Sequence, residues 1–304
     1  MAEGFSFGSF VWWMGVVEDR NDPDKLGRVR VRVFGYHSDD TGELPSNTLM
    51  WATVMQPTTS AAISGIGTSP TGLLPGTHVM GFFMDGEDAQ VPVIMGSMAG
   101  KPKDKKQGSA FGDPEGKFPL YTGESDVNRL SRNEKTDETI LSSDSKKNTD
   151  TASSVGGGTW QEPKSPYDPS YPYNAVRQSE SGHVEEWDDT PGKERLHRYH
   201  KAGTFEEIHP DGTKVVKVVK DNYTVVMGDD FIHVLGNSNL SVDGNCNIKV
   251  AGNATLEVSG NMSQKVSGNA SLEVGGNYDV KVGGSHTDQA GGRRMLGASR
   301  IDFN

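Results

Sequence analysis

Histidine is the commonest protein ligand for transition metals, and four of the chain's eight histidines lie within one short stretch. They are His183, His197, His200 and His209. Their spacings do not match a zinc site, and no cysteine lies among them. We therefore interpret them as strand and turn residues, and we expect no cofactor.

Two further sets of polar residues approach the pattern of a metal site. Asp19, Asn21 and Asp24 have nearly the spacing of a calcium loop, but a proline stands where the third ligand belongs, so a plain turn is predicted. His286 and Asp288, near the C-terminal end of the chain, would place three imidazoles and three carboxylates around the axis of a trimer. That set suits an octahedral metal ion, and a frayed, hydrated end is the alternative.

Anion-binding patterns are present but incomplete. Ser64–Thr68 resembles a phosphate loop, yet no Gly-Lys-Ser/Thr follows and no helix is indicated, so a long flexible loop is predicted. Arg28, Arg30 and Arg32 alternate with valines and could hold single-stranded nucleic acid. Acidic neighbours and a net charge of −11 argue against nucleic acid as a partner and favour a solvated or protein-contacting face.

The most regular feature of the chain is a repeat near the C-terminus. Glycine recurs at every eighth residue from 228 to 292, and valine stands two residues before it from 226 to 282. A large aliphatic residue stands four before the glycine in every octad from 232 to 280 except at Gln264. Apolar residues two apart predict a strand with one buried face, and Gly-Asn predicts a tight corner. Each octad is therefore expected to form one short strand and one corner of a β-helix or β-prism.

The number of octads indicates how the prism is closed. About nine octads in one chain would give only about three turns with little core. Three chains wound together would give about nine layers, a rod of roughly 40 Å at about 4.8 Å per layer. Opposite charges would then alternate up its outer wall, at Lys249, Glu257, Lys265, Glu273 and Lys281. We predict an obligate homotrimer, with Cys246 as a small buried side chain on the inward face.

Residues 1–100 are predicted to form a second all-β unit. Five strand-like runs occupy Trp12–Asp19, Gly27–Tyr36, Leu49–Gln56, His78–Asp85 and Val91–Met98. Five strands in about 90 residues fit a small OB-fold barrel. The N-terminus lacks the basic start of a signal peptide and no apolar run is long enough to span a membrane, so we expect assembly in a cytoplasm.

Several motifs stand out in this region: Gly15–Arg20 with Asp22-Pro23, Lys25–Val33, Gln56-Pro57, Thr59–Ala62 and Ser64–Gly67. Together they resemble a known family, the central spikes of T-even-like contractile phage tails. The resemblance covers most of residues 12–100. It implies an OB-fold barrel that docks on a trimeric hub protein, and a location in the virion at the tail baseplate.

Residues 101–175 are predicted to be an extended linker, because no helical or strand period survives in their polar sequence. The best-known member of the resembled family carries a lysozyme domain between barrel and rod. A glycosidase needs two carboxylates about 5–10 Å apart in a rigid cleft, and this segment is too short and irregular to build one. We therefore interpret Glu115, Glu124 and Asp126 as solvated charges and expect no enzymatic activity.

Residues 176–220 are predicted to form a neck of short strands, similar to that of the valine-glycine repeat spikes of type VI secretion, and 221–304 the rod. The last apolar stretch, Arg293–Phe303, could cap the rod or receive a tip protein. The function we predict is a structural spike that contacts and pierces the host outer membrane when the sheath contracts.

Three alternatives remain open. One is the spike of a type VI secretion or tailocin particle. Such spikes usually carry the hub domain ahead of the barrel, whereas here the barrel begins by residue 12. Another is a glycan-binding adhesin that stacks sugars on Trp160, Tyr167, Tyr171 and Tyr173. The third is a peptidoglycan hydrolase.

Overall fold

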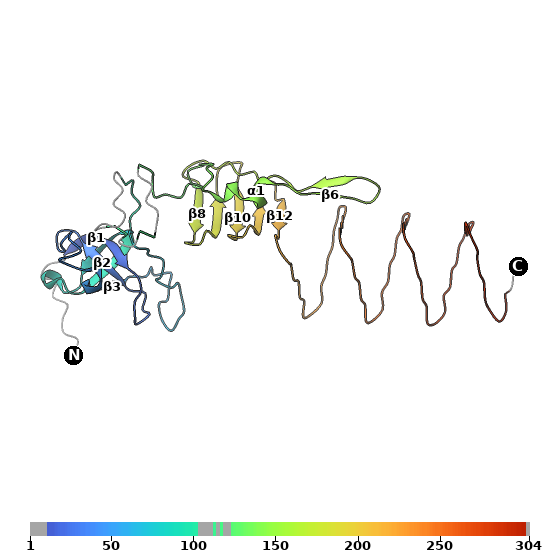
Figure 1. Cartoon of the computed structure of the whole chain (residues 1–304), viewed down its shortest axis with the longest axis horizontal. Helices are drawn as coiled ribbons and strands as arrows, with labels where there is room; N and C mark the ends of the chain where they lie inside the picture. Colours follow the sequence, from blue (N-terminus) through green and yellow to red (C-terminus); the bar gives the residue numbers. More distant parts are fainter. Residues whose placement is uncertain (1–10, 103–111, 114–115, 118–122, 302–304) are drawn as a thin grey trace. The chain divides into compact units, whose positions relative to one another are not determined.

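A computed structural model of the chain describes residues 11–102, 112–113, 116–117 and 123–301 (Figure 1). The chain forms two units, residues 1–241 and 242–304, which are described separately. The first unit holds a barrel and a five-stranded sheet; the second holds most of the octads.

The predicted N-terminal barrel is confirmed. Its five strands close in the order β1-β2-β3-β5-β4, with β3 and β5 parallel and the other pairs antiparallel. The strands are β1 (Trp12–Asp19), β2 (Val29–Val33), β3 (Trp51–Val54), β4 (His78–Phe83) and β5 (Pro92–Ser97). The interior is filled by Trp13, Val17, Val29, Val31, Val33, Ala52, Val79, Phe83 and Ile94.

One glycine makes the packing of the largest interior side chain possible. A Cβ atom at Gly81 on β4 would lie 1.9 Å from the carbonyl oxygen of Val93 and 2.6 Å from the Trp13 ring. Real Cβ atoms never approach other atoms so closely, so only glycine fits. The gap that it leaves lets the indole of Trp13 lie across the barrel interior.

The second sheet is an antiparallel meander of five strands joined by tight turns. The strands are β8 (Asn174–Gln178), β9 (Val184–Asp188), β10 (Arg195–Tyr199), β11 (Phe205–Ile208) and β12 (Lys214–Lys217). Each connecting turn contains a glycine with positive φ, at Gly182, Gly192, Gly203 and Gly212. These glycines take the backbone conformation that other residues adopt only at a cost.

Residues 123–175 differ from the extended linker that the sequence predicts. They contain two short helical turns, η3 (Ile140–Ser142) and α1 (Asp144–Lys147), and a hairpin of β6 (Thr151–Ser153) and β7 (Thr159–Gln161). We call residues 123–173 the covering segment, because Leu130 and Tyr167 within it are buried in one core with Val184, Tyr199, Phe205 and Val215 of the sheet. A few tertiary contacts, not a periodic pattern, therefore fold this polar stretch.

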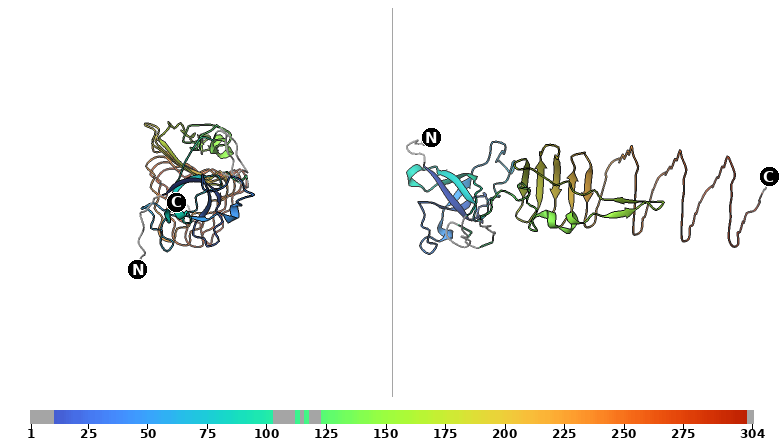
Figure 2. Two further views of the ribbon diagram at one scale, coloured as in Figure 1. Left: turned by 90° about the vertical axis from the view of Figure 1, so that its left-hand side faces the viewer. Right: turned by 90° about the horizontal axis from the view of Figure 1, so that it is seen from above.

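The second unit follows an open winding path (Figures 1 and 2). Over residues 242–301 the chain bends at each repeat glycine and at the residue before it. No strand forms among these described residues, and every one of them is exposed within the single chain.

Candidate functional site

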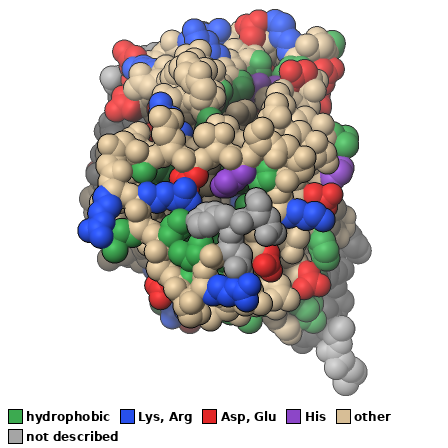
Figure 3. Space-filling view, turned by 90° about the vertical axis from the view of Figure 1, so that its right-hand side faces the viewer, with side chains coloured by type: hydrophobic (Ala, Val, Ile, Leu, Met, Phe, Trp, Pro, Cys, Tyr) green, Lys and Arg blue, Asp and Glu red, His purple; other side chains and the backbone are tan. Residues whose placement is uncertain are grey.

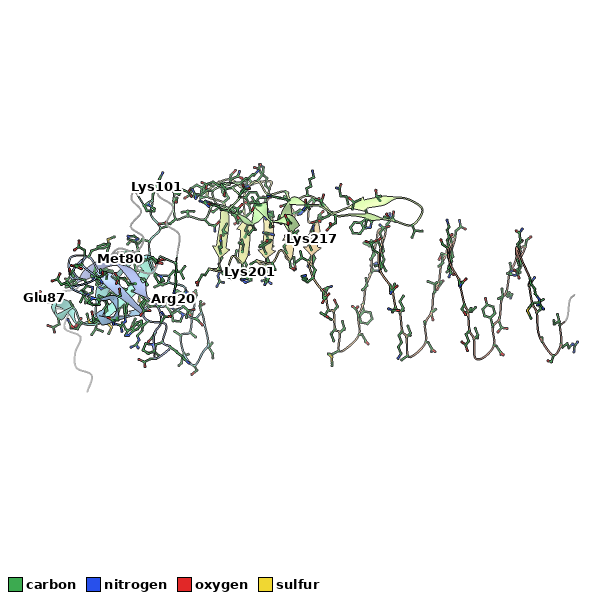
Figure 4. The ribbon with its side chains drawn as sticks, in the orientation of Figure 1. Arg20, Met80, Glu87, Lys101, Lys201 and Lys217 are labelled. Carbon is green, nitrogen blue, oxygen red and sulfur yellow. The ribbon has the colours of Figure 1, made fainter. Side chains whose placement is uncertain are left out.

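The octads present an apolar surface that the single chain leaves uncovered. The valines two before each glycine, from Val226 to Val282, are 43–54% exposed, and the larger aliphatic residues four before it, from Ile232 to Val280, are 57–86% exposed. Figure 3 shows hydrophobic side chains open at the surface among charged ones, and in Figure 4 the octad side chains project into open space. An apolar surface of this extent marks an interaction site.

The octad backbone needs partners as well. Between the described residues 220–299, no backbone–backbone hydrogen bond forms within the chain. Most peptide groups of a folded protein are paired, and burying an unpaired one costs free energy. The apolar faces can therefore be buried only if other chains supply the missing ladder of hydrogen bonds. The geometry describes an assembly surface and not a binding pocket.

The inner face of the sheet carries the opposite kind of structure, a buried cluster of charges. Arg195 on β10 donates to Glu186 on β9 at 2.7 Å and to Glu207 on β11 at 2.8 Å. Lys146, from α1 of the covering segment, donates to Glu207 at 2.9 Å and lies 3.9 Å from the centre of the Phe205 ring. All four charged side chains are at most 2% exposed. Two negative and two positive charges thus cancel between the five-stranded sheet and the covering segment, which together we call the sheet domain.

The environment of this cluster sets the ionisation of its members. Burial opposes the charge of Glu186, but the hydrogen bond from His197 and the charge of Arg195 outweigh it and lower its pKa to about 2. Burial likewise opposes the charge of Glu207, and Lys146 with Arg195 outweighs it, so the pKa of Glu207 is also lowered to about 2. Burial lowers the pKa of His197 more than its contact with Glu186 raises it. The ring is therefore neutral, with Nδ1 donating to Glu186 at 2.8 Å.

Comparison with known proteins assigns both regions. Residues 35–172 match the Gp5 N-terminal OB domain, and residues 187–295 match the bacteriophage T4 gp5 C-terminal trimerisation domain. Protein Gp5 of Vibrio phage KVP40 is 41% identical over 251 residues, which cover 71% of this chain and 59% of that protein. The chain is homologous to Gp5. The pre-baseplate central spike protein Gp5 of Enterobacteria phage T4 is 44% identical over 127 residues, 40% of this chain and 22% of that protein.

This homology confirms the predicted resemblance and supports the homotrimer. The trimerisation domain covers the octads from Gly228 to Gly292 and the sheet from the end of β9 to β12. The predicted location in the virion, at the tail baseplate, agrees with these Gp5 relatives. The chain spans less than two thirds of the length of either relative, and neither matched domain is a lysozyme domain.

The arginine stripe that the sequence predicts on the Gp5 barrel is not an open face. Arg32 is fully buried and forms a two-pronged ion pair with Glu18, at 2.6 and 3.1 Å. It also donates to the carbonyl oxygens of Ser38 and Leu44, because the chain after β2 folds over it. Arg30 lies over the Trp51 ring at 4.4 Å. The stripe holds the barrel's own loops in place.

The turn before β2 depends on a residue that the calcium-loop comparison missed. Asp22 accepts hydrogen bonds from the backbone of Asp24, Leu26 and Arg28, and from the Arg28 guanidinium at 2.7 and 3.1 Å. The contact with Arg28 lowers the pKa of Asp22 far below its usual range. An aspartate followed by proline, with an arginine six residues after the aspartate, was the available signal in the sequence.

The loop that contains Ser64–Thr68 is closed by a hydrogen bond, in which the Thr68 amide donates to the Ser60 hydroxyl at 2.8 Å.

The structure separates the four predicted histidines. His197 is buried beside Glu186, and the Nε2 atom of His209 lies 3.8 Å from Glu207. Only His183 and His200 are brought together, with ring centres 4.5 Å apart. Among the described residues no three His, Cys, Asp or Glu side chains converge as a possible metal site.

The three predicted residues of the octad region, His286, Asp288 and Cys246, lie on the open path and are exposed in the single chain. Asp288 pairs with Arg294 at 2.7 Å. Cys246 is exposed in the single chain, as are all its neighbours, so its predicted burial depends on the trimer.

The carboxylates of the covering segment are engaged in ion pairs and turns. Glu124 accepts from Arg129 at 2.7 Å, and Glu138 pairs with the same arginine. Asp126 accepts from the Gly100 amide at 2.8 Å. They line an open hollow of about 580 Å³ at the surface, where the Glu124 side chain is 40% exposed and Asp126 is exposed, so both keep the contact with solvent that the sequence predicts. Glu115 lies outside the described residues.

The aromatic residues considered for sugar stacking do not form one platform. Tyr167 is 7% exposed and donates its hydroxyl to the carbonyl oxygen of Leu130 at 2.8 Å. Trp160 lies on β7, and Tyr171 and Tyr173 precede β8.

No helix in the described part of the chain has both the length and the apolar character to cross a membrane.

Proposed function

We propose that the chain is the structural, non-enzymatic central spike of a contractile phage tail. The single observation that carries the proposal is the uncovered aliphatic surface of the octads, on a backbone without hydrogen bonds of its own. Two further copies of the chain cover this aliphatic surface and supply the missing backbone hydrogen bonds. The result is a rod in which no strand can separate without unwinding the others. Such a rod resists bending when the contracting sheath drives it through the host outer membrane.

We infer that the barrel is the part of the chain that docks on the trimeric baseplate hub protein. The paired strands β1 and β4 place Trp12, Met14 and Met80 on the outside of the barrel, where they are 52%, 47% and 38% exposed. Large flexible and aromatic side chains of this kind are enriched at protein interfaces. The C-terminal end of the rod is left for a tip-capping protein.

The mass of the purified protein in solution tests the spike. We expect light scattering to give about 98 kDa, three times the chain mass of 32.8 kDa. A mass near that of one chain would overturn the interwound rod. In the same preparation we expect no hydrolysis of peptidoglycan, and measurable hydrolysis would overturn the non-enzymatic assignment.

A further inference from the structure

The hairpin β6–β7 is an exposed element attached to a well-packed domain. Its three pairs are Thr151 with Gln161, Ala152 with Trp160, and Ser153 with Thr159, and it extends past β12 in Figure 1. Every residue from Val155 to Gln161 is exposed, and Val155 at the tip is 98% exposed. Because a two-stranded hairpin is marginally stable in water by itself, an arm of this kind needs something to pack against.

The two faces of the arm differ in chemistry. Directly paired residues of an antiparallel ladder share a face, so Ala152 and Trp160 lie together on one side. The threonine, serine and glutamine of the other two pairs lie on the opposite side. Trp160 is 44% exposed, which leaves much of a large apolar ring open to solvent. From residue 151 to 161 the arm carries no charged side chain, whereas 23% of the whole chain is charged.

The base of the arm is held firmly to the sheet at β12. Lys217, labelled in Figure 4, donates to Glu162 at 2.8 Å and to the carbonyl oxygen of Asn148 at 2.9 Å, and it pairs with Asp150 at 3.1 Å. The Glu162 amide donates to the carbonyl oxygen of Asp150 at 2.8 Å, and the Asp150 amide donates to the Glu162 carboxylate at 3.1 Å. The direction of the arm is therefore fixed although its apolar face is open.

The first residues after β12 are open in the same way. Tyr223, Val225 and Val226 are 84%, 79% and 48% exposed. The arm and these residues both leave the sheet domain next to Lys217. Lys217 and residues 223–226 lie inside the range of the trimerisation domain, and the arm is tied to that range through Lys217. A trimer therefore brings three uncharged arms and three apolar chain segments to the same level.

We propose that the Ala152–Trp160 face of the arm packs on a neighbouring copy of the chain, at the level where the octads begin. The proposal rests on the trimer proposed above. Contact with an adjacent protomer covers the tryptophan, stabilises the hairpin and ties each sheet domain to the next before the octads wind together. The absence of charge in the arm fits an aliphatic surface and does not fit an acidic or basic partner.

Site-specific photo-cross-linking tests this contact on the full-length protein. A benzophenone amino acid replaces Trp160 in one variant and Thr159, its neighbour on the polar face, in the matched control. After irradiation and complete denaturation, we expect the position 160 variant to yield covalent products of two and three times 32.8 kDa, several-fold more than the position 159 control. Cross-links only within one chain, or equal yields from the two positions, would overturn the proposal.

A second measurement separates this proposal from that of the spike. The mass of each variant is measured before irradiation, so a trimer without cross-links contradicts only the arm contact, whereas a monomer contradicts the spike itself. Amide hydrogen exchange on the unmodified protein supplies an independent readout. We expect the amides of 151–161 to exchange several-fold more slowly in the trimer of the natural protein than in a Trp160→Ser variant that is also a trimer. Equal exchange in the two proteins would also overturn the contact.

Discussion

The sheet domain and the octad region use short β segments and glycine corners in opposite ways. The sheet buries its inner face under the covering segment of its own chain, including the charges of Arg195, Glu186 and Glu207. The octads keep every described side chain from 242 to 301 exposed in the single chain. The difference separates a part whose core lies within one chain from a part whose core exists only between chains.

This comparison has a thermodynamic consequence. The stability of the sheet domain comes from contacts within one chain, whereas that of the octads depends on the concentration of protomers. Changes in the octads should therefore act on assembly, and changes in the charge cluster should act on local unfolding.

The largest effect is expected from charges placed on the octad face. We expect Val258→Asp combined with Val266→Asp to abolish trimer formation, because each trimer would bury six carboxylates without partners, and each such group costs several kcal/mol. Light scattering of the purified variant measures the mass. Replacing the outward Glu257 and Lys265 with glutamine is the control and should leave the trimer intact. A normal yield of trimer from the double aspartate variant would contradict an interwound core.

The sequence predicted the parts of the fold that repeat or alternate. The octads are visible because one valine and one glycine recur at a fixed spacing, and the barrel strands because valines alternate on β2. Arg32 obeyed the alternation yet is buried, because the irregular loop that follows β2 folds back over it. No local sequence pattern predicts that a loop will cover this side chain.

The covering segment was beyond prediction for a related reason. Leu130, Lys146 and Tyr167 stand alone in polar, aperiodic sequence, and each is fixed by a contact with the distant sheet. The inner face of the sheet was hidden too, because Glu186 and Glu207 occupy positions where alternation would place apolar residues. Their cationic partners come from another strand and from the covering segment, which spacing alone cannot pair.

An intermediate effect is expected from breaking the charge cluster. Arg195→Met leaves Glu186 and Glu207 buried with one cation fewer, and removing one partner of a buried ion pair costs about 3–5 kcal/mol. Hydrogen exchange of the amides in 184–217 measures the local loss. Arg198→Met, on the same strand but with a side chain 79% exposed, is the matched control and should change stability by less than about 0.5 kcal/mol. Equal losses in the two variants would show that the cluster does not stabilise the sheet.

The smallest effect is expected from mild acidification, and it should appear in the sheet domain. The pKa of His197 is lowered from its ordinary value of 6.5 by burial, so the unfolded chain takes up this proton first as the pH falls. Stability is then lost as the pH falls through 6.5 towards the lower pKa of the folded state. Glu186 and Glu207, with pKa values lowered from 4.5 to about 2, lose their contribution only between pH 4.5 and about 2.

A variant at His197 separates the pH range in which the histidine acts from the lower range in which Glu186 and Glu207 act. Between about pH 7.5 and 5.5 the carboxylates stay ionised in both states, and His197 is the cluster member whose ordinary pKa of 6.5 lies inside this range. His197→Gln keeps a hydrogen-bond donor for Glu186 but cannot titrate. We expect exchange of the 184–217 amides to accelerate on acidification more in the natural protein than in the variant, after correction for the intrinsic pH dependence of exchange. An identical pH dependence in the two proteins would show that His197 is not held neutral by the sheet.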